Sequence, residues 1–449
     1  MRISTSMIYD TGLRSINDQT ASMLHTQQQL SSGRRVVTPA DDPVAAARAL
    51  VVTEAQDINT QFGTNQSSAK EALSLEESQM SVLNDIITRV RELAVQGGDA
   101  ALSQSDLRSI SDELRSRFDE LTGIANATDA NGDYIFSGNM GGTKPFGANV
   151  DNLLAGGGDV TYSGDYGQRN LQVSPTRFIQ TSDSGADIFT QVRNGNGSFV
   201  TDYNGNNTGS GVIDAGSVTN TATWNALADK NYSVNIWVDA TGVAGTAGTT
   251  YYDIVDSTTG NSMLTGAAAA NPPTTAAQFQ SLRKYYDNQT IQLSRQTGDP
   301  GPAFDLGGNV TITGTPANGD QFTIAPSTTQ SVFKTISNLI GALENKLANP
   351  TKSGSAALAN EIAQTLTNLD QANDNVLRVR SGIGARLNEL DSLSGVNQDL
   401  NLRYSETLSN LQDVDYAKSI SNLMQSQTSL DAAQKSYLKV TQLGLFNYL

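Results

Sequence analysis

The chain has no cysteine and a single histidine, His25, among its 449 residues. Without cysteine there is no disulfide and no thiolate chemistry. Zinc sites draw on clusters of His and Cys, and one histidine among Gln and Thr is more typical of a helix surface than of a metal ligand. We therefore expect no metal site, no cofactor and no catalytic residue.

Charged residues and long apolar runs are also scarce. Only 16% of the residues are charged, and the formal net charge is −16. An acidic chain lacks the basic face that binds phosphates, so we expect no nucleic acid as a partner. No apolar stretch is long enough to cross a bilayer, and the polar first nine residues do not resemble a secretory signal. We expect no membrane partner, and either retention in the cell or export by another route.

Apolar residues recur at alternating steps of three and four near both ends of the chain. Such a pattern places an apolar seam along one side of a helix, and the seam needs a partner. Neither end is apolar enough to fold alone, so the seams must pack on each other or on those of neighbouring molecules. This indicates an assembly protein rather than an enzyme. The candidate assembly interface is Leu13, Ile16, Met23, Leu30, Leu411, Ile420, Leu423, Leu430 and Tyr437.

The first 140 residues are predicted to be mainly helical. Asp42 and Pro43 suit the cap and the first position of a helix, which Gly63 is expected to end. Apolar residues at near-heptad steps predict two further helices, over residues 73–94 and 107–124.

The centre of the chain, to about residue 327, is rich in Gly, Thr, Asn and Asp. We expect this all-β region to begin and end with adjacent strands near Phe136 and Phe333, to contain a brief helix over residues 278–286, and to be followed by helices. Short alternating runs predict strands at residues 134–136, 160–162, 171–173, 232–238, 251–255, 310–312 and 322–324.

Several segments resemble the flagellin superfamily. Residues 29–35 (QLSSGRR), which run into 40–43 (ADDP), are similar to the N-terminal signature of that family. Residues 88–96 and 105–110 resemble its second conserved helix and loop, and residues 429–449 its C-terminal helix. The resemblance covers roughly the first 140 and the last 120 residues.

Residues 132–138, 314–322 and 443–449 resemble the hook–filament junction branch of the superfamily. This resemblance implies an α+β multi-domain fold, with a terminal coiled-coil or helical rod and an inserted all-β domain. We expect a terminal coiled-coil domain, a helical rod domain and a β-rich domain of one or two subdomains, which comprise residues 1–42 with 420–449, residues 43–140 with 330–419, and residues 141–329.

The resemblance also implies a structural role in the bacterial flagellum, adapting hook to filament. The implied partners are the first hook-associated junction protein, flagellin, further copies in a ring and a cytoplasmic export chaperone. The location would be extracellular, reached through the flagellar type III apparatus. The chaperone would cover the amphipathic tail that carries Leu430, Tyr437, Leu438, Leu443 and Phe446.

Two other functions compete with this interpretation. The chain could be filament flagellin, a member of the same superfamily. Alternatively, its centre could be a glycan-binding or hydrolytic module, because Trp224 and Trp237 both lie there, although a β core easily takes up two indoles.

Charged residues in the conserved segments have local interpretations too. Capping and solvation account for the acidic pairs 41–42 and 76–77 better than calcium binding or acid–base catalysis. Residues 34–35 (Arg-Arg) fit an intersubunit contact or a solvated turn. Arg89, Leu93 and Glu113 match receptor-binding positions of some flagellins, but packing or pairing within the rod is the more ordinary role.

Overall fold

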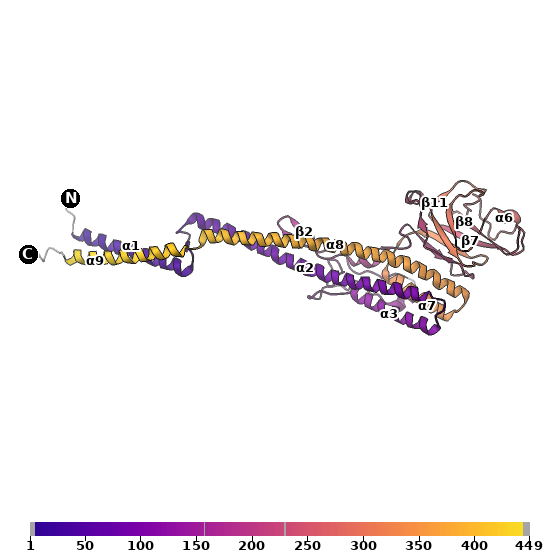
Figure 1. Ribbon diagram of the computed structural model, residues 1–449, viewed down its shortest axis with the longest axis horizontal. Coiled ribbons are helices and arrows are strands. Elements are labelled where there is room, and N and C mark those ends of the chain that lie inside the picture. Colours follow the sequence, from indigo (N-terminus) through magenta and orange to yellow (C-terminus); the bar gives the residue numbers. More distant parts are fainter. Residues whose placement is uncertain (1–4, 157, 229, 443–449) are drawn as a thin grey trace, which may run out of the picture. The chain divides into compact units, whose positions relative to one another are not determined.

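Figure 1 shows the computed structural model, which describes residues 5–156, 158–228 and 230–442. Contacts divide the chain into two compact units, each built from distant segments. The first unit comprises residues 1–68, 172–178 and 389–449, and the second comprises residues 69–171 and 179–388. The domain boundaries expected from the sequence remain a prediction.

Helices occupy most of the two ends of the chain, and short helical segments lie in its centre. Their bounds are α1 Thr5–Ser32, α2 Pro43–Gly97, α3 Gln104–Ala125, α4 Val150–Gly156, the π-helix Ala186–Thr190, α5 Thr221–Ala226, α6 Ala276–Gln280, α7 Val332–Ala348, α8 Lys352–Gln412 and α9 Tyr416–Gln442.

The starts of these helices follow the expected capping chemistry. The Asp42 carboxylate accepts a hydrogen bond from Ala45 N at 3.0 Å, and Pro43 is the first residue of α2. Ser103 caps α3 in a reciprocal pair with Asp106, and Ser331 caps α7. The predicted cap of α2 is confirmed.

The predicted end of α2 at Gly63 is wrong, because the helix continues to Gly97. Polar contacts hold the helix on both sides of this glycine. Asn59 bonds to Asn397 O at 2.9 Å, and the Gln66 amide bonds to Val173 O at 2.8 Å. A glycine inside a helix costs only about 1 kcal/mol relative to alanine, which such contacts outweigh.

Strands build two larger antiparallel sheets in the centre of the chain (Figure 1). One has the order β4-β12-β7-β8-β9, and in the other β11 pairs with β10, β5 and β6. The bounds are β1 Asn170–Ser174, β2 Arg177–Gln180, β3 Val192–Arg193, β4 Phe199–Tyr203, β5 Val212–Ile213, β6 Ser217–Val218, β7 Tyr232–Asp239, β8 Thr249–Asp256, β9 Arg283–Lys284, β10 Gln289–Ser294, β11 Asp305–Thr313, β12 Gln321–Pro326 and β13 Thr329–Gln330.

The alternating runs at 171–173, 232–238, 251–255, 310–312 and 322–324 lie in these strands, as predicted. Inward side chains of the last four runs share one apolar core with Trp224, whose indole N–H donates to Ser198 O at 3.1 Å. The helical parts and these sheets confirm the predicted α+β class with an inserted β-rich part.

Two predicted strands and part of a helix are not formed. Tyr134 and Tyr162 each make only an isolated bridge, to Thr128 and Phe146. The predicted helix over 278–286 is limited to α6, and the chain then enters β9. Short runs of this kind depend on a neighbouring strand that the sequence does not reveal.

The expected adjacent strands at Phe136 and Phe333 are also wrong. The strands that flank the two larger sheets are β3 and β13, which pair with each other. Phe136 and Phe333 instead belong to a cluster of fully buried rings that contact one another between α3, α7 and the segment after α3. The cluster comprises Phe118, Phe136, Phe146, Phe189 and Phe333.

Solvation does not account for Glu76, which is buried. Its Oε1 accepts a hydrogen bond from Asp183 N at 3.0 Å, and its Oε2 has no partner within the described ranges. The Asp183 carboxylate pairs with Arg386 of α8. Burial, followed by the nearby Asp183 charge, raises the pKa of Glu76 to about 8. Its burial thus leaves Glu76 with a carboxyl group that keeps its proton at neutral pH.

This raised pKa makes stability depend on pH. The folded chain holds the Glu76 proton up to about pH 8, whereas the unfolded chain releases it near 4.5. The stabilising term is therefore complete below about pH 4.5 and is lost as the pH rises towards 8, by at most about 1.4 kcal/mol per pH unit. We expect Glu76→Gln to remove this slope from denaturant unfolding measured between these pH values. Ser78→Ala, which changes an exposed position of α2 and removes no titratable group, should leave the slope intact. Equal slopes in wild type and Glu76→Gln would contradict the prediction.

Candidate assembly surface of the terminal helices

Helices α1 and α9 lie side by side and run in opposite directions (Figure 1). Near the start of α1, the Tyr9 ring meets Tyr437 of α9 edge to face, with centroids 6.2 Å apart. Gly12 makes room for the same ring, because a Cβ at this position would lie 2.8 Å from Tyr437 Cδ2. The two ends of the sequence therefore pack on each other within one molecule.

The contact seam of this pair follows a heptad rhythm on both helices. Large and small or polar side chains alternate along it, so every second position contributes little apolar area. On α1 the half-buried seam positions are Tyr9, Gly12, Ile16, Gln19, Met23, Thr26 and Leu30. On α9 they are Ser419, Leu423, Ser426, Leu430, Ala433 and Tyr437. The structure thus places Ile16, Met23, Leu30, Leu423, Leu430 and Tyr437 of the predicted interface in the intramolecular seam.

No residue whose side-chain burial is described in α1 or α9 is fully buried. Two helices enclose a seam from only two sides, so water still reaches the edges of each leucine. Burying a leucine completely stabilises a fold by about 1.5–3 kcal/mol, and much of that gain is unused here.

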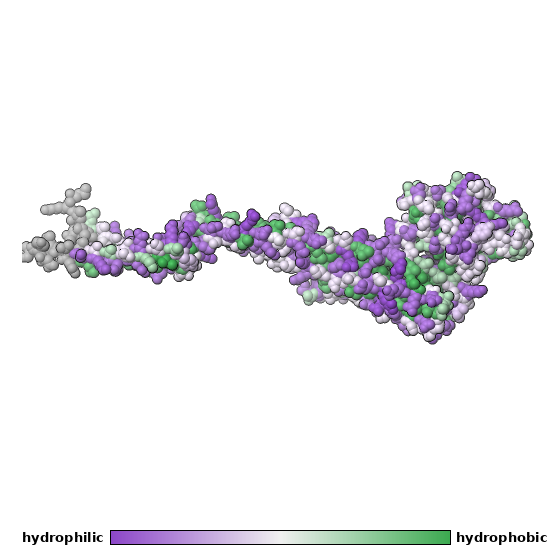
Figure 2. All heavy atoms as spheres, in the orientation of Figure 1, coloured by the Kyte–Doolittle hydropathy of each residue, from purple (hydrophilic) through white to green (hydrophobic). Residues whose placement is uncertain are grey.

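The other predicted residues of these helices lie outside the seam. Leu13 and Ile420 each follow a seam position, and their side chains are exposed. Leu24, Met424 and Leu438 also follow seam positions and are exposed. In an antiparallel heptad pair, the positions that follow the seam lie on the same side of both helices. These five exposed apolar side chains therefore lie on one side of the pair, between polar positions. Figure 2 shows hydrophobic residues among hydrophilic ones on the surface of this part of the molecule.

The turn between α1 and α2 is tied to the turn between α8 and α9. Gly33 follows the last residue of α1 with φ +69°, a conformation that favours glycine, and its carbonyl accepts a hydrogen bond from Val414 N at 3.0 Å. Arg35 N donates to Gln412 O at 2.6 Å, and its guanidinium binds Leu411 O at 2.8 Å and Asp42 at 3.1 Å. In this structure Arg35 therefore makes contacts within its own chain.

The remaining predicted positions, Leu411 and the residues of the chaperone-binding tail, differ in how far they are buried. Leu411 is half-buried near the end of α8, where its carbonyl accepts the Arg35 bond. In the predicted chaperone-binding tail, Leu430 and Tyr437 are half-buried and Leu438 is exposed. Leu443 and Phe446 lie outside the described residues.

The residues that the sequence offered for other functions, such as glycan or receptor binding, have structural roles. Trp224 and Trp237 are buried in the β-rich part, so neither indole offers a platform for a glycan. Arg89 makes two hydrogen bonds to Glu113, at 2.7 and 3.0 Å, and Leu93 is buried. His25 contacts Asp41 at 2.9 Å on the surface. Within the described ranges, no helix is long and apolar enough to span a membrane.

Known proteins are similar to this chain in sequence and in fold. The N-terminal helical region of bacterial flagellin matches residues 3–140. Flagellar hook-associated protein 3 of Escherichia coli (strain K12) is 24% identical over 446 residues, which is 99% of either chain. The crystal structure of the flagellar junction protein FlgL from Legionella pneumophila is 26% identical, with a TM-score of 0.64, over 82% of this chain and 100% of that one. These comparisons support an FlgL-type flagellar junction protein.

Filament flagellin is similar over a smaller part. Flagellin of Escherichia coli (strain K12) is 30% identical over 152 residues, which is 34% of this chain and 30% of that protein. Flagellar hook-associated protein 3 of Escherichia coli, by contrast, aligns along nearly the whole chain, through its centre as well as its ends. The predicted junction-protein identity is confirmed, and the flagellin alternative is the less supported one. The relatives of FlgL type are structural components of the flagellum, and the comparisons support the same role for this chain.

Proposed function

We propose that this chain joins hook to filament by packing its terminal helices against neighbouring axial proteins. One observation carries the proposal: the α1–α9 pair has a half-open seam and further apolar side chains that its own chain leaves exposed. Exposed apolar faces of this kind are characteristic of surfaces that are covered on association.

The partners follow from this position in the flagellum. The α1–α9 pair would contact the first hook-associated junction protein on one side, flagellin on the other, and further copies of itself in a ring. The role is structural rather than catalytic, and the place of action is outside the cell. Before assembly, a cytoplasmic chaperone would cover the part of α9 that carries Leu430, Tyr437 and the exposed Leu438.

Removal of residues 420–449 tests the proposal. This deletion takes away most of α9 and exposes the seam of α1 completely. We expect the truncated chain to be absent from isolated flagella and to leave cells of the deletion strain without attached filaments. The two sheets should still fold, because their apolar core contains no residue from α9.

Point variants separate assembly from export. Leu423→Asp places an unpaired charge in the α1–α9 seam, whereas Ser421→Asp changes a neighbouring exposed position. We expect only Leu423→Asp to be secreted yet missing from flagella. Normal incorporation of the truncated chain or of Leu423→Asp would overturn the proposal, and long filaments of the purified wild type grown on hooks would favour flagellin instead.

A further inference from the structure

Asparagine is followed by glycine five times in the chain, and each of these pairs lies outside the helices and strands. In such a pair the glycine nitrogen can attack Cγ of the asparagine side chain, because glycine has no Cβ to obstruct closure of the ring. The surroundings of each pair then decide whether the attack occurs. The pairs are residues 131–132, 194–195, 196–197, 204–205 and 318–319.

The glycine N–H donates a hydrogen bond in four of the five pairs. A main-chain nitrogen must lose its proton before it attacks, so each of these bonds protects its pair. The acceptors are Asp129 O for Gly132 at 3.0 Å, Asn368 Oδ1 for Gly195 at 2.8 Å, Asn194 O for Gly197 at 3.4 Å and Ile236 O for Gly319 at 2.9 Å. The fold therefore hinders ring closure at these four pairs.

The remaining pair, formed by Asn204 and Gly205, differs from the others. It directly follows β4, and Gly205 is exposed. The Gly205 N–H has no hydrogen-bond partner among the residues that the structure describes. Water and dissolved base therefore reach this nitrogen, and no hydrogen bond to the protein has to break before its proton leaves.

The Asn204 side chain is turned along the chain that follows it. Its Oδ1 accepts a hydrogen bond from Asn206 N at 3.0 Å, which is the contact of an Asx turn. This bond withdraws electron density from the amide carbonyl, so Cγ becomes a better target for a nucleophile. Nδ2, the group that must leave, is held by a bond to Gln321 Oε1 at 3.2 Å. The attacking nitrogen and its target carbon thus come from adjacent residues of one turn.

We propose that Asn204 is a site of spontaneous deamidation through a cyclic imide with Gly205. Base removes the proton of Gly205 N, and the nitrogen bonds to Asn204 Cγ. The bond between Cγ and Nδ2 breaks, and Nδ2 leaves as ammonia with a proton from water. Water then opens the imide on either side of the nitrogen, which gives aspartate or isoaspartate at position 204. In sum, the amide and water become a carboxylate and ammonium, and no oxidant or reductant is needed.

The product changes the surface at this turn. Asp202 lines the same surface cavity as Gly205, so the new carboxylate adds to an acidic region. It no longer donates a bond to Gln321, whereas Asn207 still exchanges hydrogen bonds with Gln321 N and O, each at 2.9 Å. The turn therefore stays attached to β12 when the amide reacts. Because hydrolysis does not restore the amide, the converted fraction increases with the age of the chain.

Mass spectrometry of the ageing chain tests the proposal. The purified full-length protein is kept at mildly alkaline pH, and proteolytic peptides from successive times are searched for the replacement of an amide by an acid. We expect conversion at Asn204 to be about ten times faster than at the other four pairs, which corresponds to about 1.4 kcal/mol of activation free energy. In denaturant, all five pairs should react at similar rates, because no fold then protects four of them.

Gly205→Ala is the matched variant. A Cβ at this position meets no atom within 4 Å, and Gly205 does not have the positive φ that disfavours alanine, so the variant should keep the wild-type melting temperature. The added methyl group crowds the closing ring and should slow conversion at Asn204 about tenfold. Equal rates at all five pairs of the folded chain, faster conversion at another pair, a rate difference that persists in denaturant, or an unchanged rate in Gly205→Ala would overturn the inference.

Discussion

Phe333→Ala lowers the free energy of unfolding of the second unit by about 3–5 kcal/mol. The Phe333 ring is fully buried at the start of α7. Its centroid lies 5.6 Å from that of Phe118, 5.5 Å from Phe146 and 6.1 Å from Phe189. Removing this ring leaves a cavity among aromatic neighbours that come from separate segments, and such a site collapses poorly because each neighbour is held by its own backbone.

Denaturant unfolding of the full chain, followed by tryptophan fluorescence and by circular dichroism, measures this loss. Tyr286→Ala is the matched control, because it removes an aromatic ring from an exposed position of the same unit. We expect the control to change the free energy of unfolding by less than about 0.5 kcal/mol. A loss below about 1 kcal/mol for Phe333→Ala would show that the ring cluster is not the packing centre inferred here.

Local patterns predicted the helices and most strands well. Asp42 and Pro43 mark the start of α2 because capping needs only residues within one turn. The strands β7, β8, β11 and β12 could be predicted because apolar and polar side chains alternate over enough residues to bury one face of each strand. In the same way, the heptad rhythm of the terminal segments predicted a coil whose halves lie at opposite ends of the chain.

Features that depend on distant neighbours were missed. Gly63 has the residue type of a helix end, but contacts to α8 and to the β1–β2 hairpin keep α2 helical there. Glu76 has the sequence context of a solvated carboxylate and is buried by a loop more than a hundred residues away. Among the candidate assembly residues, periodicity alone did not tell seam positions from exposed ones. Ile16 and Leu423 face the partner helix, whereas Leu13 and Ile420 face outward.

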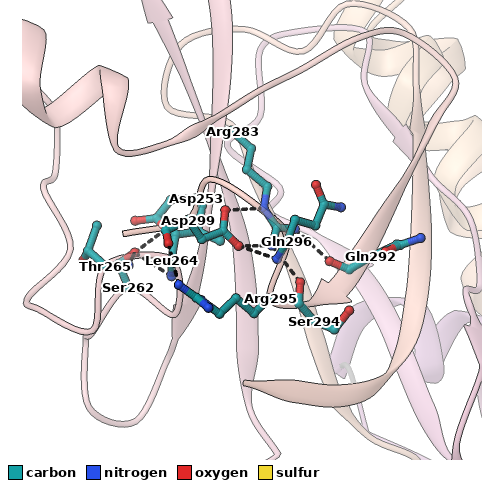
Figure 3. A network of polar contacts seen from close by, with 10 residues as sticks. All are labelled: Asp253, Ser262, Leu264, Thr265, Arg283, Gln292, Ser294, Arg295, Gln296 and Asp299. Carbon is teal, nitrogen blue, oxygen red and sulfur yellow. Dashed lines mark hydrogen bonds and ion pairs between the residues drawn. The ribbon is translucent and has the colours of Figure 1, made fainter. Parts of the chain in front are cut away.

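The ion pair between Arg283 and Asp299 is another such feature, and it is almost fully enclosed. Figure 3 shows the two side chains facing each other in the β-rich part. Only 9% of the arginine and 6% of the aspartate side chain is exposed. The Asp299 carboxylate accepts bonds from Arg283 Nε at 3.0 Å and from Gln296 N at 2.7 Å, and the guanidinium also donates to Ser294 O at 2.7 Å. The pair thereby connects the edge strand β9 to the loop that follows β10.

Asp299→Ala should therefore destabilise the β-rich part by about 3–5 kcal/mol, because it leaves the Arg283 charge buried without its counter-ion. Glu113→Ala is the matched control, since Glu113 also binds an arginine through two hydrogen bonds but is about a third exposed. We expect that variant to lose less than about 1 kcal/mol, because water screens the pair. Unfolding followed by tryptophan fluorescence compares the two variants, and equal losses would show that burial does not strengthen the Asp299 pair.

The pH dependence of the same pair gives an independent measurement. Burial acts to raise the pKa of Asp299, but the hydrogen bonds from Arg283 and Gln296 outweigh it, and the pKa lies below its usual value of 3.8. The stabilisation is therefore complete above the unfolded pKa and is lost as the pH falls through the lower folded value. We expect the difference in free energy of unfolding between wild type and Asp299→Ala to be constant from pH 5 to 8 and to shrink below about pH 4. A double variant, Arg283→Met with Asp299→Leu, removes both charges and should recover most of the loss, because no unpaired charge then remains in the core.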